Sequence, residues 1–346
     1  INAQPDSDVV FIIASNDTGE ATVTNALTFT STNWNTPQTV TVTGADDDII
    51  DGTISTTVDV AINDGASDNN FDALSPQAIS VTIADDDTAG FTIVQSGGST
   101  SVSESGTTDT FTLVLNAQPD SNVVFIVSSS DTGEATVNTP FTFSTENWDT
   151  PRTVTVTGAD DNLIDGTITS TITVTVNDGI SDDNFDGVAD QTVSVTTTDN
   201  DAAGFTIAQS GGSTSVSEDG TTDTFTVVLN AQPASDVVLT ITSGDTGEAT
   251  VNSPLTFTAG NWNSAQTVTV TGVNDNLVDG TINSTITVAV KDDNSDNNFD
   301  PVADQTVSVS TVDNDTAGFT ITETGGSTAV AETGTCLLYT SDAADE

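Results

Sequence analysis

Basic residues are almost absent from the sequence. It has only two, Arg152 and Lys291, and no histidine, against 52 acidic residues, so the formal net charge is −50. Binding of nucleic acid needs clustered Lys and Arg side chains, so nucleic acid is excluded as a partner. An anionic membrane surface is disfavoured for the same reason. Because the usual nucleophile–base pairs need histidine, we also expect no enzymatic activity.

Cysteine and long apolar runs are equally scarce. The chain has one cysteine, Cys336, and no methionine. Without further cysteines, no disulfide can link parts of the fold. No stretch approaches the roughly 18 consecutive apolar residues of a transmembrane helix, so no direct membrane insertion is expected. Stability must therefore come from hydrophobic cores, from packing between neighbouring repeats of the same chain, or from bound ions.

The sequence repeats itself with a period of 114 residues. Trp34, Trp148 and Trp262 keep this spacing, and so does the tetrapeptide Asn-Ala-Gln-Pro at 2–5, 116–119 and 230–233. Such a period is the size of a whole domain and too long for one solenoid unit. We predict a truncated repeat at 1–87, complete repeats at 88–201 and 202–315, the start of a further repeat at 316–335, and a separate tail at 336–346.

The tail at 336–346 departs abruptly from the repeat. It holds the only Cys and the only Tyr of the chain. It resembles the conceptual translation of a transposase-type sequencing-library adapter, and we predict that it does not pack on the repeats. A genuine divergent C-terminus is the alternative. Because residue 1 falls inside a repeat, we expect a longer parent protein.

Short stretches of alternating apolar and polar residues predict β-strands. Residues 153–156 read Thr-Val-Thr-Val, and residues 123–127 form the continuous apolar run of a sandwich-core strand. The sequence Ser-Gly-Gly-Ser at 96–99 suits a kink in the first strand. We count seven or eight strands per repeat and no helical period. The prediction is an all-β chain of tandem antiparallel, immunoglobulin-like β-sandwich domains in a beaded array.

Acidic residues gather where the predicted strands end. Strands of a sandwich alternate in direction, so several of these ends should meet, and their carboxylates would repel each other unless a cation lay among them. A hard cation with six to eight oxygen ligands would remove this repulsion. Ca²⁺ fits this description best, and Mg²⁺ is second. The candidates in the second copy are Glu104, Asp131, Glu134, Asp160, Asp161, Asp165, Asp199 and Asp201.

The same positions in the other two copies supply further candidate ligands. In the first copy they are Asp17, Glu20, Asp46, Asp47, Asp51, Asp85 and Asp87. In the third copy they are Glu218, Asp245, Glu248, Asp275, Asp279, Asp313 and Asp315. After the buried strand of each copy stand two acids, such as Asp131 and Glu134, and spacing does not decide which of them is the ligand.

Three short motifs together resemble the Calx-β domain family. Val102-Ser103-Glu104 closes the first strand, Asp160-Asp161 forms a turn two-thirds of the way along, and a closing Asp-x-Asp precedes Gly-Phe-Thr-Ile at 204–207. The resemblance spans each repeat. It implies a seven-stranded Ca²⁺-binding sandwich, as found in the regulatory region of sodium–calcium exchangers and in large bacterial surface proteins. The ligands that it implies are Glu104, Glu218, Asp160, Asp161, Asp165, Asp199 and Asp201.

The copies depart from this pattern at two places. The turn of the third copy reads Asn274-Asp275, which is one carboxylate fewer. The closing cluster is Asp-Asn-Asp in the second and third copies but three aspartates at 85–87. The alternative to an ion site is a solvated acidic surface that keeps the protein soluble. The acidic loop at 177–186 is interpreted as a long solvated turn, with a further ion site as the alternative. Trp148 is interpreted as a core residue rather than as a residue that stacks on a sugar.

These patterns favour a structural role at the cell surface or outside the cell. The predicted function is a calcium-stiffened stalk in a large secreted or cell-surface adhesive protein, in which repeats follow one another almost without linkers. Its partners would be calcium ions and neighbouring repeats. In the alternatives, the repeats themselves bind a surface glycan or a protein of a partner cell, or they form an appendage of a secreted hydrolase.

Overall fold

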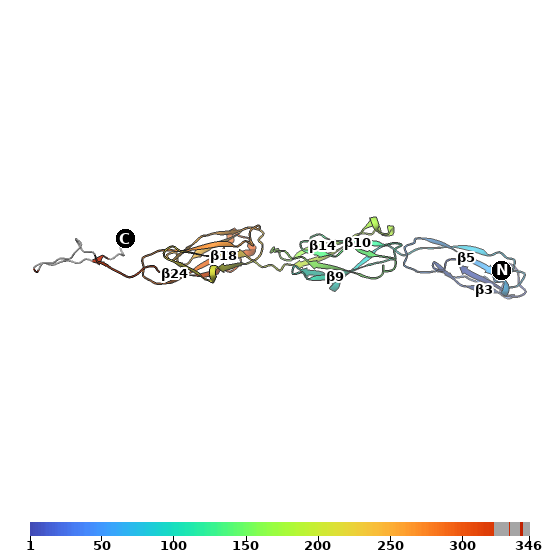
Figure 1. Ribbon diagram of the computed structural model, residues 1–346. Helices are drawn as coiled ribbons and strands as arrows, with labels where there is room; N and C mark the ends of the chain where they lie inside the picture. The colour runs from blue at the N-terminus through green and yellow to red at the C-terminus, as the bar shows by residue number, and fades with distance from the viewer. Residues whose placement is uncertain (322–331, 333–339, 342–346) are drawn as a thin grey trace. The chain divides into compact units, whose positions relative to one another are not determined.

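The computed structural model describes residues 1–321, 332 and 340–341 of the chain. Within these residues the regular structure consists of β-strands and short 3₁₀ helices, which confirms the predicted all-β sandwich fold (Figure 1). The chain forms two compact units, Ile1–Asp160 with Ile168–Thr198, and Asp161–Thr167 with Asp199–Glu346. In the described part of the chain, no helix has the length and apolar character needed to cross a membrane.

The second copy lies mostly in the first unit and has two facing sheets (Figure 1). One sheet has the strand order β12-β10-β14-β15-β8 and the other β11-β13-β9-β7. The strands are β7 (Phe91–Gln95), β8 (Thr100–Ser103), β9 (Thr108–Leu115), β10 (Val123–Ser129), β11 (Ala135–Val137), β12 (Phe141–Phe143), β13 (Arg152–Gly158), β14 (Ile168–Val176) and β15 (Gln191–Thr198). The 3₁₀ helices are η2 (Ser96–Gly98), η3 (Asp178–Ile180) and η4 (Asp183–Phe185).

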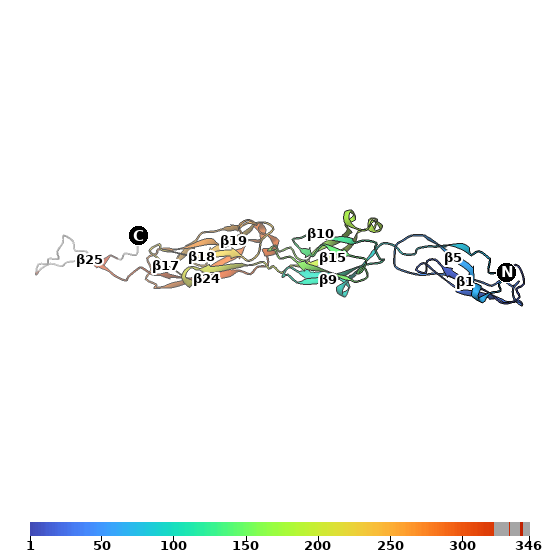
Figure 2. The same ribbon diagram turned by 45° about the vertical axis from the view of Figure 1, so that its right-hand side comes forward.

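The third copy, in the second unit, repeats this topology (Figure 2). Its sheets have the orders β17-β24-β23-β19-β21 and β16-β18-β22-β20. The strands are β16 (Phe205–Gln209), β17 (Thr214–Ser217), β18 (Thr222–Leu229), β19 (Val237–Ser243), β20 (Ala249–Val251), β21 (Leu255–Phe257), β22 (Gln266–Gly272), β23 (Ile282–Val290) and β24 (Gln305–Val312). The 3₁₀ helices are η5 (Ser210–Gly212), η6 (Asp292–Asn294) and η7 (Asn297–Phe299).

The first copy contributes two smaller sheets, with the orders β3-β1-β5-β6 and β2-β4. The strands are β1 (Val9–Ser15), β2 (Ala21–Val23), β3 (Ala26–Phe29), β4 (Val42–Gly44), β5 (Ile54–Ile62) and β6 (Gln77–Ile83), and the 3₁₀ helix is η1 (Asp64–Ala66). Its strand pairs are antiparallel and keep the register of the other copies: Phe11 pairs with Ile62 as Phe125 pairs with Val176.

The predicted kink in the first strand is a crossing from one sheet to the other. Gly97 and Gly98 have φ of 67° and 84°, values that an L residue rarely adopts, so the chain can turn there. Strand β7 pairs with β9 in one sheet, whereas β8 pairs with β15 in the other, and this second pairing is parallel. The sandwiches are therefore mixed rather than purely antiparallel, and splitting the first strand raises the strand number of a complete copy to nine.

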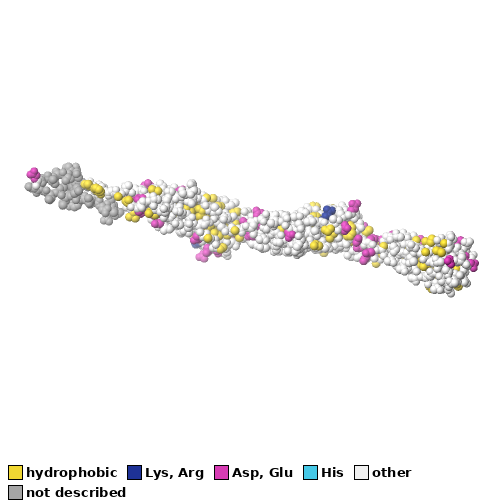
Figure 3. All heavy atoms as spheres, turned by 90° about the horizontal axis from the view of Figure 1, so that it is seen from below, with side chains coloured by type: hydrophobic (Ala, Val, Ile, Leu, Met, Phe, Trp, Pro, Cys, Tyr) yellow, Lys and Arg dark blue, Asp and Glu magenta, His cyan; other side chains and the backbone are white. Residues whose placement is uncertain are grey.

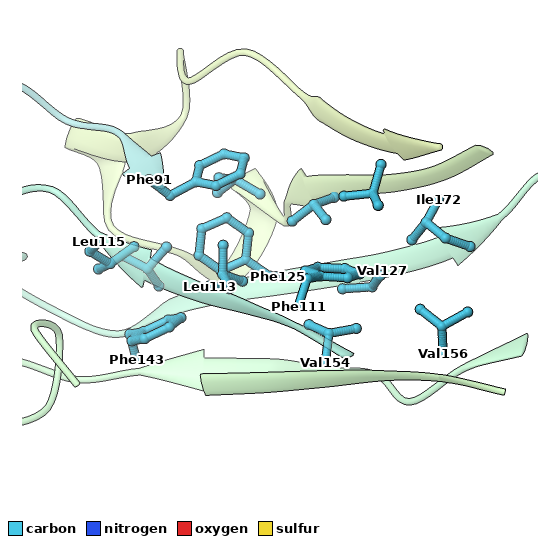
Figure 4. Close-up of a cluster of buried hydrophobic side chains, with 14 of the residues drawn as sticks. Phe91, Phe111, Leu113, Leu115, Phe125, Val127, Phe143, Val154, Val156 and Ile172 are labelled. Atoms are coloured by element: carbon cyan, nitrogen blue, oxygen red, sulfur yellow. The ribbon is translucent and has the colours of Figure 1, made fainter. Parts of the chain in front are cut away.

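The cores lie between the two sheets of each sandwich. In the second copy, Phe91, Leu113, Phe125 and Phe143 point toward one another and are buried (Figure 4). Burial of each such side chain stabilises the fold by about 1.5–3 kcal/mol. Trp148 packs against this core, which confirms its interpretation as a core residue. Trp262 packs in the same way against the core of the third copy.

The interpretation of the loop at 177–186 as a solvated turn was wrong in part. The loop contains η3 and η4, and Asp182 and Phe185 within it are buried. The Asp182 carboxylate accepts hydrogen bonds from the backbone N–H of Ser121 at 2.7 Å and of Asn184 at 2.9 Å. Asp296 makes the matching bonds in the third copy, from the N–H of Ser235 and of Asn298. A buried carboxylate satisfied by backbone donors closes this loop onto the fold.

Little of the predicted tail is described. Strand β26 (Thr340–Ser341) pairs antiparallel with β25 (Thr320–Ile321), which differs from the expectation that the tail makes no contact with the repeats. Cys336 and the rest of the tail lie outside the described residues, as does most of the predicted start of a further repeat at 316–335.

Candidate metal centre

A close approach of two strands places Glu218 in the third copy. Glu218 follows β17, and its backbone N–H donates to the carbonyl of Val312 at 3.1 Å. Gly272 ends β22 beneath this crossing, where a Cβ atom would collide with the carbonyl oxygen of Ser217. Only glycine therefore lets β17 pass so close to β22. The Glu218 side chain is 1% exposed, so the crossing delivers a carboxylate into the end of the sandwich.

Glu248 enters the same region from the segment between β19 and β20. Its carbonyl oxygen accepts a hydrogen bond from the N–H of Val273 at 2.8 Å, which ties this segment to the loop after β22. The side chain of Glu248 is 6% exposed. Asp245, three residues earlier, instead stays at the surface, where its carboxylate accepts a bond from the N–H of Gly247 at 3.0 Å. The structure thus buries the second of the two acids that follow the strand.

Local turns orient the remaining acids of the third copy. Asp275 accepts a hydrogen bond from the N–H of Leu277 at 2.7 Å. Asp313 accepts from the N–H of Asp315 at 2.6 Å and from the N–H of Gly280 at 2.8 Å. These backbone bonds lower the pKa of Asp313 below its ordinary value of 3.8. Hydrogen bonds to the charged form keep this carboxylate ionised.

The acids of the third copy form two overlapping groups. Glu218, Glu248 and Asp275 each place one carboxylate oxygen within 4.8 Å of the others. Glu218, Asp313 and Asp315 do the same. Glu218 belongs to both groups. All of these donors are oxygens, which is the ligand chemistry of Ca²⁺ and Mg²⁺ rather than of zinc or copper.

Burial and mutual repulsion act on the glutamates of this cluster. Burial, and then the carboxylates of Asp279 and Asp245, raise the pKa of Glu248 above its ordinary value of 4.5. Burial also raises the pKa of Glu218, with the N–H of Asn314 opposing and the carboxylate of Asp313 adding to the rise. None of the groups that shift these two pKa values is positively charged. The ionised cluster therefore costs free energy until a cation enters it.

Two buried oxygens of the cluster lack a hydrogen-bond partner among the residues that the structure describes. They are Oε2 of Glu248 and Oδ2 of Asp315. Buried polar atoms are almost always hydrogen-bonded, so these two oxygens are available to a ligand such as an ion or a water. One lies in each of the two overlapping groups. The donor set and these two atoms together fit a hard divalent cation.

The first copy brings its matching acids around a small cavity. It has a volume of about 30 Å³, enough for one water-sized ligand. Burial, and then the carboxylates of Asp51, Asp17 and Asp47, raise the pKa of Glu20 above its ordinary value of 4.5. The acids that line the cavity are Glu20, Asp46, Asp47, Asp51, Asp85, Asp86 and Asp87. Asp17, the remaining candidate, accepts from the N–H of Gly19 at 3.1 Å and does not line it.

The matching residues of the second copy have the same local conformations. Glu104 and Glu134 are buried. Asp131 is exposed and accepts from the N–H of Gly133 at 3.0 Å. Asp161 accepts from the N–H of Leu163 at 2.7 Å, and Asp199 accepts from the N–H groups of Asp201 and Gly166 at 2.6 and 2.9 Å. Asp160 and Asp165 are the remaining candidates here, and Asp165 is exposed.

Sequence reasoning missed two residues at these sites. Asn314 donates its backbone N–H to Oε2 of Glu218 at 3.3 Å, and its side-chain amide donates to Oδ1 of Asn274 at 2.9 Å. It thereby links the closing cluster to the turn at the position where the third copy lacks a carboxylate. Asp86 lines the cavity of the first copy. Both stand in the middle of the closing Asp-x-Asp, so their position was a usable signal.

No protein-family model matches the chain, and no curated protein matches it in sequence. Among solved structures, domains 4–9 of the surface layer protein SbsC are 20% identical, covering 90% of this chain and 40% of that one, with a TM-score of 0.27. CBD12 from CALX1.2 is 10% identical, covering 63% of this chain and 99% of that one, with a TM-score of 0.27. An endo-fucoidan hydrolase of glycoside hydrolase family 107 is 10% identical, covering 88% and 39%, with a TM-score of 0.25.

Proposed function

We propose that the chain is a calcium-binding structural repeat region of a large secreted or cell-surface protein. The observation that carries the proposal is the Glu248 carboxylate. It is 6% exposed, its Oε2 has no hydrogen-bond partner among the described residues, and it lies within 4.8 Å of carboxylate oxygens of Glu218 and Asp275. A divalent cation there would neutralise charges that otherwise repel one another.

The ion would act on the protein through linkage. It binds only the folded arrangement of the loops, so it stabilises that arrangement by an amount set by its concentration relative to the dissociation constant. Calcium modules outside cells bind with dissociation constants of about 10⁻⁴–10⁻³ M, which matches calcium outside cells and not the much lower levels within. Repeats stabilised in this way suit a stalk that holds a binding domain away from the cell. This role needs no catalytic group.

Equilibrium dialysis of the full chain against ⁴⁵Ca²⁺, after treatment with a chelator, tests the proposal. We expect saturable binding in the range of about 10⁻⁴–10⁻³ M. Glu248→Gln should weaken calcium binding at the third copy, because it removes one carboxylate from the group with Glu218 and Asp275, while the surface variant Asp245→Asn should bind as the parent chain does, because Asp245 lies outside both carboxylate groups. Equal binding by the Glu248→Gln variant and the parent chain would contradict a site at Glu248, and the absence of saturable binding would show that the acids only solvate the surface.

A further inference from the structure

The loop that carries the turn acids also contacts the copy that follows it. In this loop two apolar residues stand between the acids, and we name the three residues 48–50, 162–164 and 276–278 the tip segments. Within the first unit, Ile49 forms a parallel bridge with Gln118, and the carbonyl of Asp48 accepts the N–H of Gln118 at 2.7 Å. Ile50 packs against the core of the second copy, and its carbonyl accepts the side-chain amide of Asn184 at 3.4 Å.

The second tip segment makes the same contacts within the second unit. Leu163 forms a parallel bridge with Gln232, and the carbonyl of Asn162 accepts the N–H of Gln232 at 2.7 Å. Ile164 packs against the core of the third copy, and its carbonyl accepts the side-chain amide of Asn298 at 2.9 Å. The first and second tip segments therefore dock in the same way, with the apolar tip against a receiving face made of a glutamine N–H and an asparagine amide.

The third tip segment has the same chemistry but is exposed. Leu277 and Val278 are 62% and 59% exposed, whereas their counterparts in the first two tips are half-buried. The tip cannot turn inward, because the loop around it is held by the bonds from Leu277 N–H to Asp275 and from Gly280 N–H to Asp313. The third tip thus exposes two adjacent apolar side chains whose counterparts in the other two tips are partly covered by the following copy.

In the first copy, the matching receiving face has no tip segment packed against it among the described residues. Gln4 and Asn70 are the counterparts of Gln232 and Asn298, and both are exposed. They line a cavity of about 440 Å³ together with Phe71. Phe11 also lines this cavity. In the second copy, its counterpart Phe125 is covered by Phe91 of strand β7 and not by a tip. Only the part lined by Gln4 and Asn70 therefore corresponds to the contact with a tip.

We propose that the tip at 276–278 is a docking surface for a further copy of this same repeat, which it meets as the second tip meets Gln232 and Asn298. Between two molecules of this chain, the partner is the receiving face at Gln4 and Asn70, and the contact is head-to-tail. Such contacts are heterologous and do not close on themselves, so they extend an array in one direction. Between consecutive copies of one polypeptide the same contact is stronger, because the linkage gives the tip and the receiving face a high effective concentration. The inference does not depend on a bound ion.

Two single variants separate the two sides of this contact. Leu277→Ser makes one of the two apolar side chains of the tip polar, and it leaves the fold intact because Leu277 is largely exposed. Asn70→Asp replaces the amide that would donate to a tip carbonyl by a carboxylate that repels it. Methyl-labelled Asn70→Asp chain, which keeps its tip, is titrated with unlabelled Leu277→Ser chain, which keeps its receiving face, and methyl resonances are followed by NMR.

We expect the methyl resonances of Leu277 and Val278 to shift and to saturate during the titration. The methyl resonances of Ile180, which is 64% exposed but lies outside every tip, should not move. An unlabelled chain with both substitutions should cause no shift. The proposal is overturned if Leu277 and Val278 do not shift up to millimolar concentration, or if the doubly substituted chain shifts them equally.

Discussion

Replacing Glu248 by glutamine should have opposite effects with and without calcium. In chelator, the substitution removes a charge from a buried side chain whose Oε2 has no hydrogen-bond partner among the described residues, and whose pKa is raised by burial and by neighbouring carboxylates. The third copy should then become more stable. In calcium, the substitution removes a ligand from the group formed with Glu218 and Asp275, so most of the stabilisation by the ion should disappear.

The size of the effect follows from the linkage between binding and folding. One ion that binds only the folded state, at about 100 times its dissociation constant, adds about 2.7 kcal/mol. For a copy of 114 residues, 1 kcal/mol raises the melting temperature by about 4 °C, so the parent chain should gain about 10 °C. A tenfold loss of calcium affinity removes about 1.4 kcal/mol of this stabilisation. The melting temperature of the Glu248→Gln variant should therefore rise in calcium by at most about half as much as that of the parent chain.

Tryptophan fluorescence can follow the third copy alone. Trp262 packs against its core, and replacing Trp34 and Trp148 by phenylalanine leaves it as the only reporter. Melting is recorded in chelator, in CaCl₂ and in NaCl of matched ionic strength, because NaCl screens repulsion without coordinating the carboxylates. Asp245→Asn is the matched control, since it removes a nearby negative charge from outside the carboxylate groups.

Two results would refute this reasoning. Equal melting temperatures in CaCl₂ and NaCl would mean that the acids respond to screening alone. A lower melting temperature of Glu248→Gln in chelator would mean that the charged side chain stabilises the ion-free fold, contrary to the hydrogen bonding and burial found for it.

Three further predictions use the same reporter. In chelator, the stability of the third copy should fall as the pH rises above 4.5. The raised pKa values of Glu218 and Glu248 let the folded state keep protons that the unfolded state releases. A melting temperature that does not change with pH in this range would contradict the raised values. Gly272→Ala should cost about 1–3 kcal/mol in denaturant unfolding, because its Cβ meets the Ser217 carbonyl, whereas Gly260→Ala, with only an ordinary contact, should be nearly neutral. Removing residues 336–346 should leave the melting temperature unchanged, since the described contact is one short strand pair, and a loss of several degrees would count against this.

The sequence by itself determined the repeat and the class of fold. Identical spacing of Trp34, Trp148 and Trp262 defines the copies, and alternation such as Thr153–Val156 places one side chain in the core and the next outside. Both are local signals, because period two follows from the pleat of a single strand. The position of the acids at strand ends is a local signal in the same sense. It identified most of the residues that come together in the carboxylate groups of the third copy.

Only the tertiary structure decided which acids meet. Asp245 and Glu248 are equal candidates in the sequence, but the turn of the backbone leaves Asp245 outside and buries Glu248. The crossing of β17 over β22 at Gly272, which brings Glu218 to the cluster, joins residues more than 50 positions apart. The docking of Ile164 on the following copy is likewise a contact between distant segments. No periodicity encodes these contacts, because each depends on the approach of two backbones that are separate in the chain.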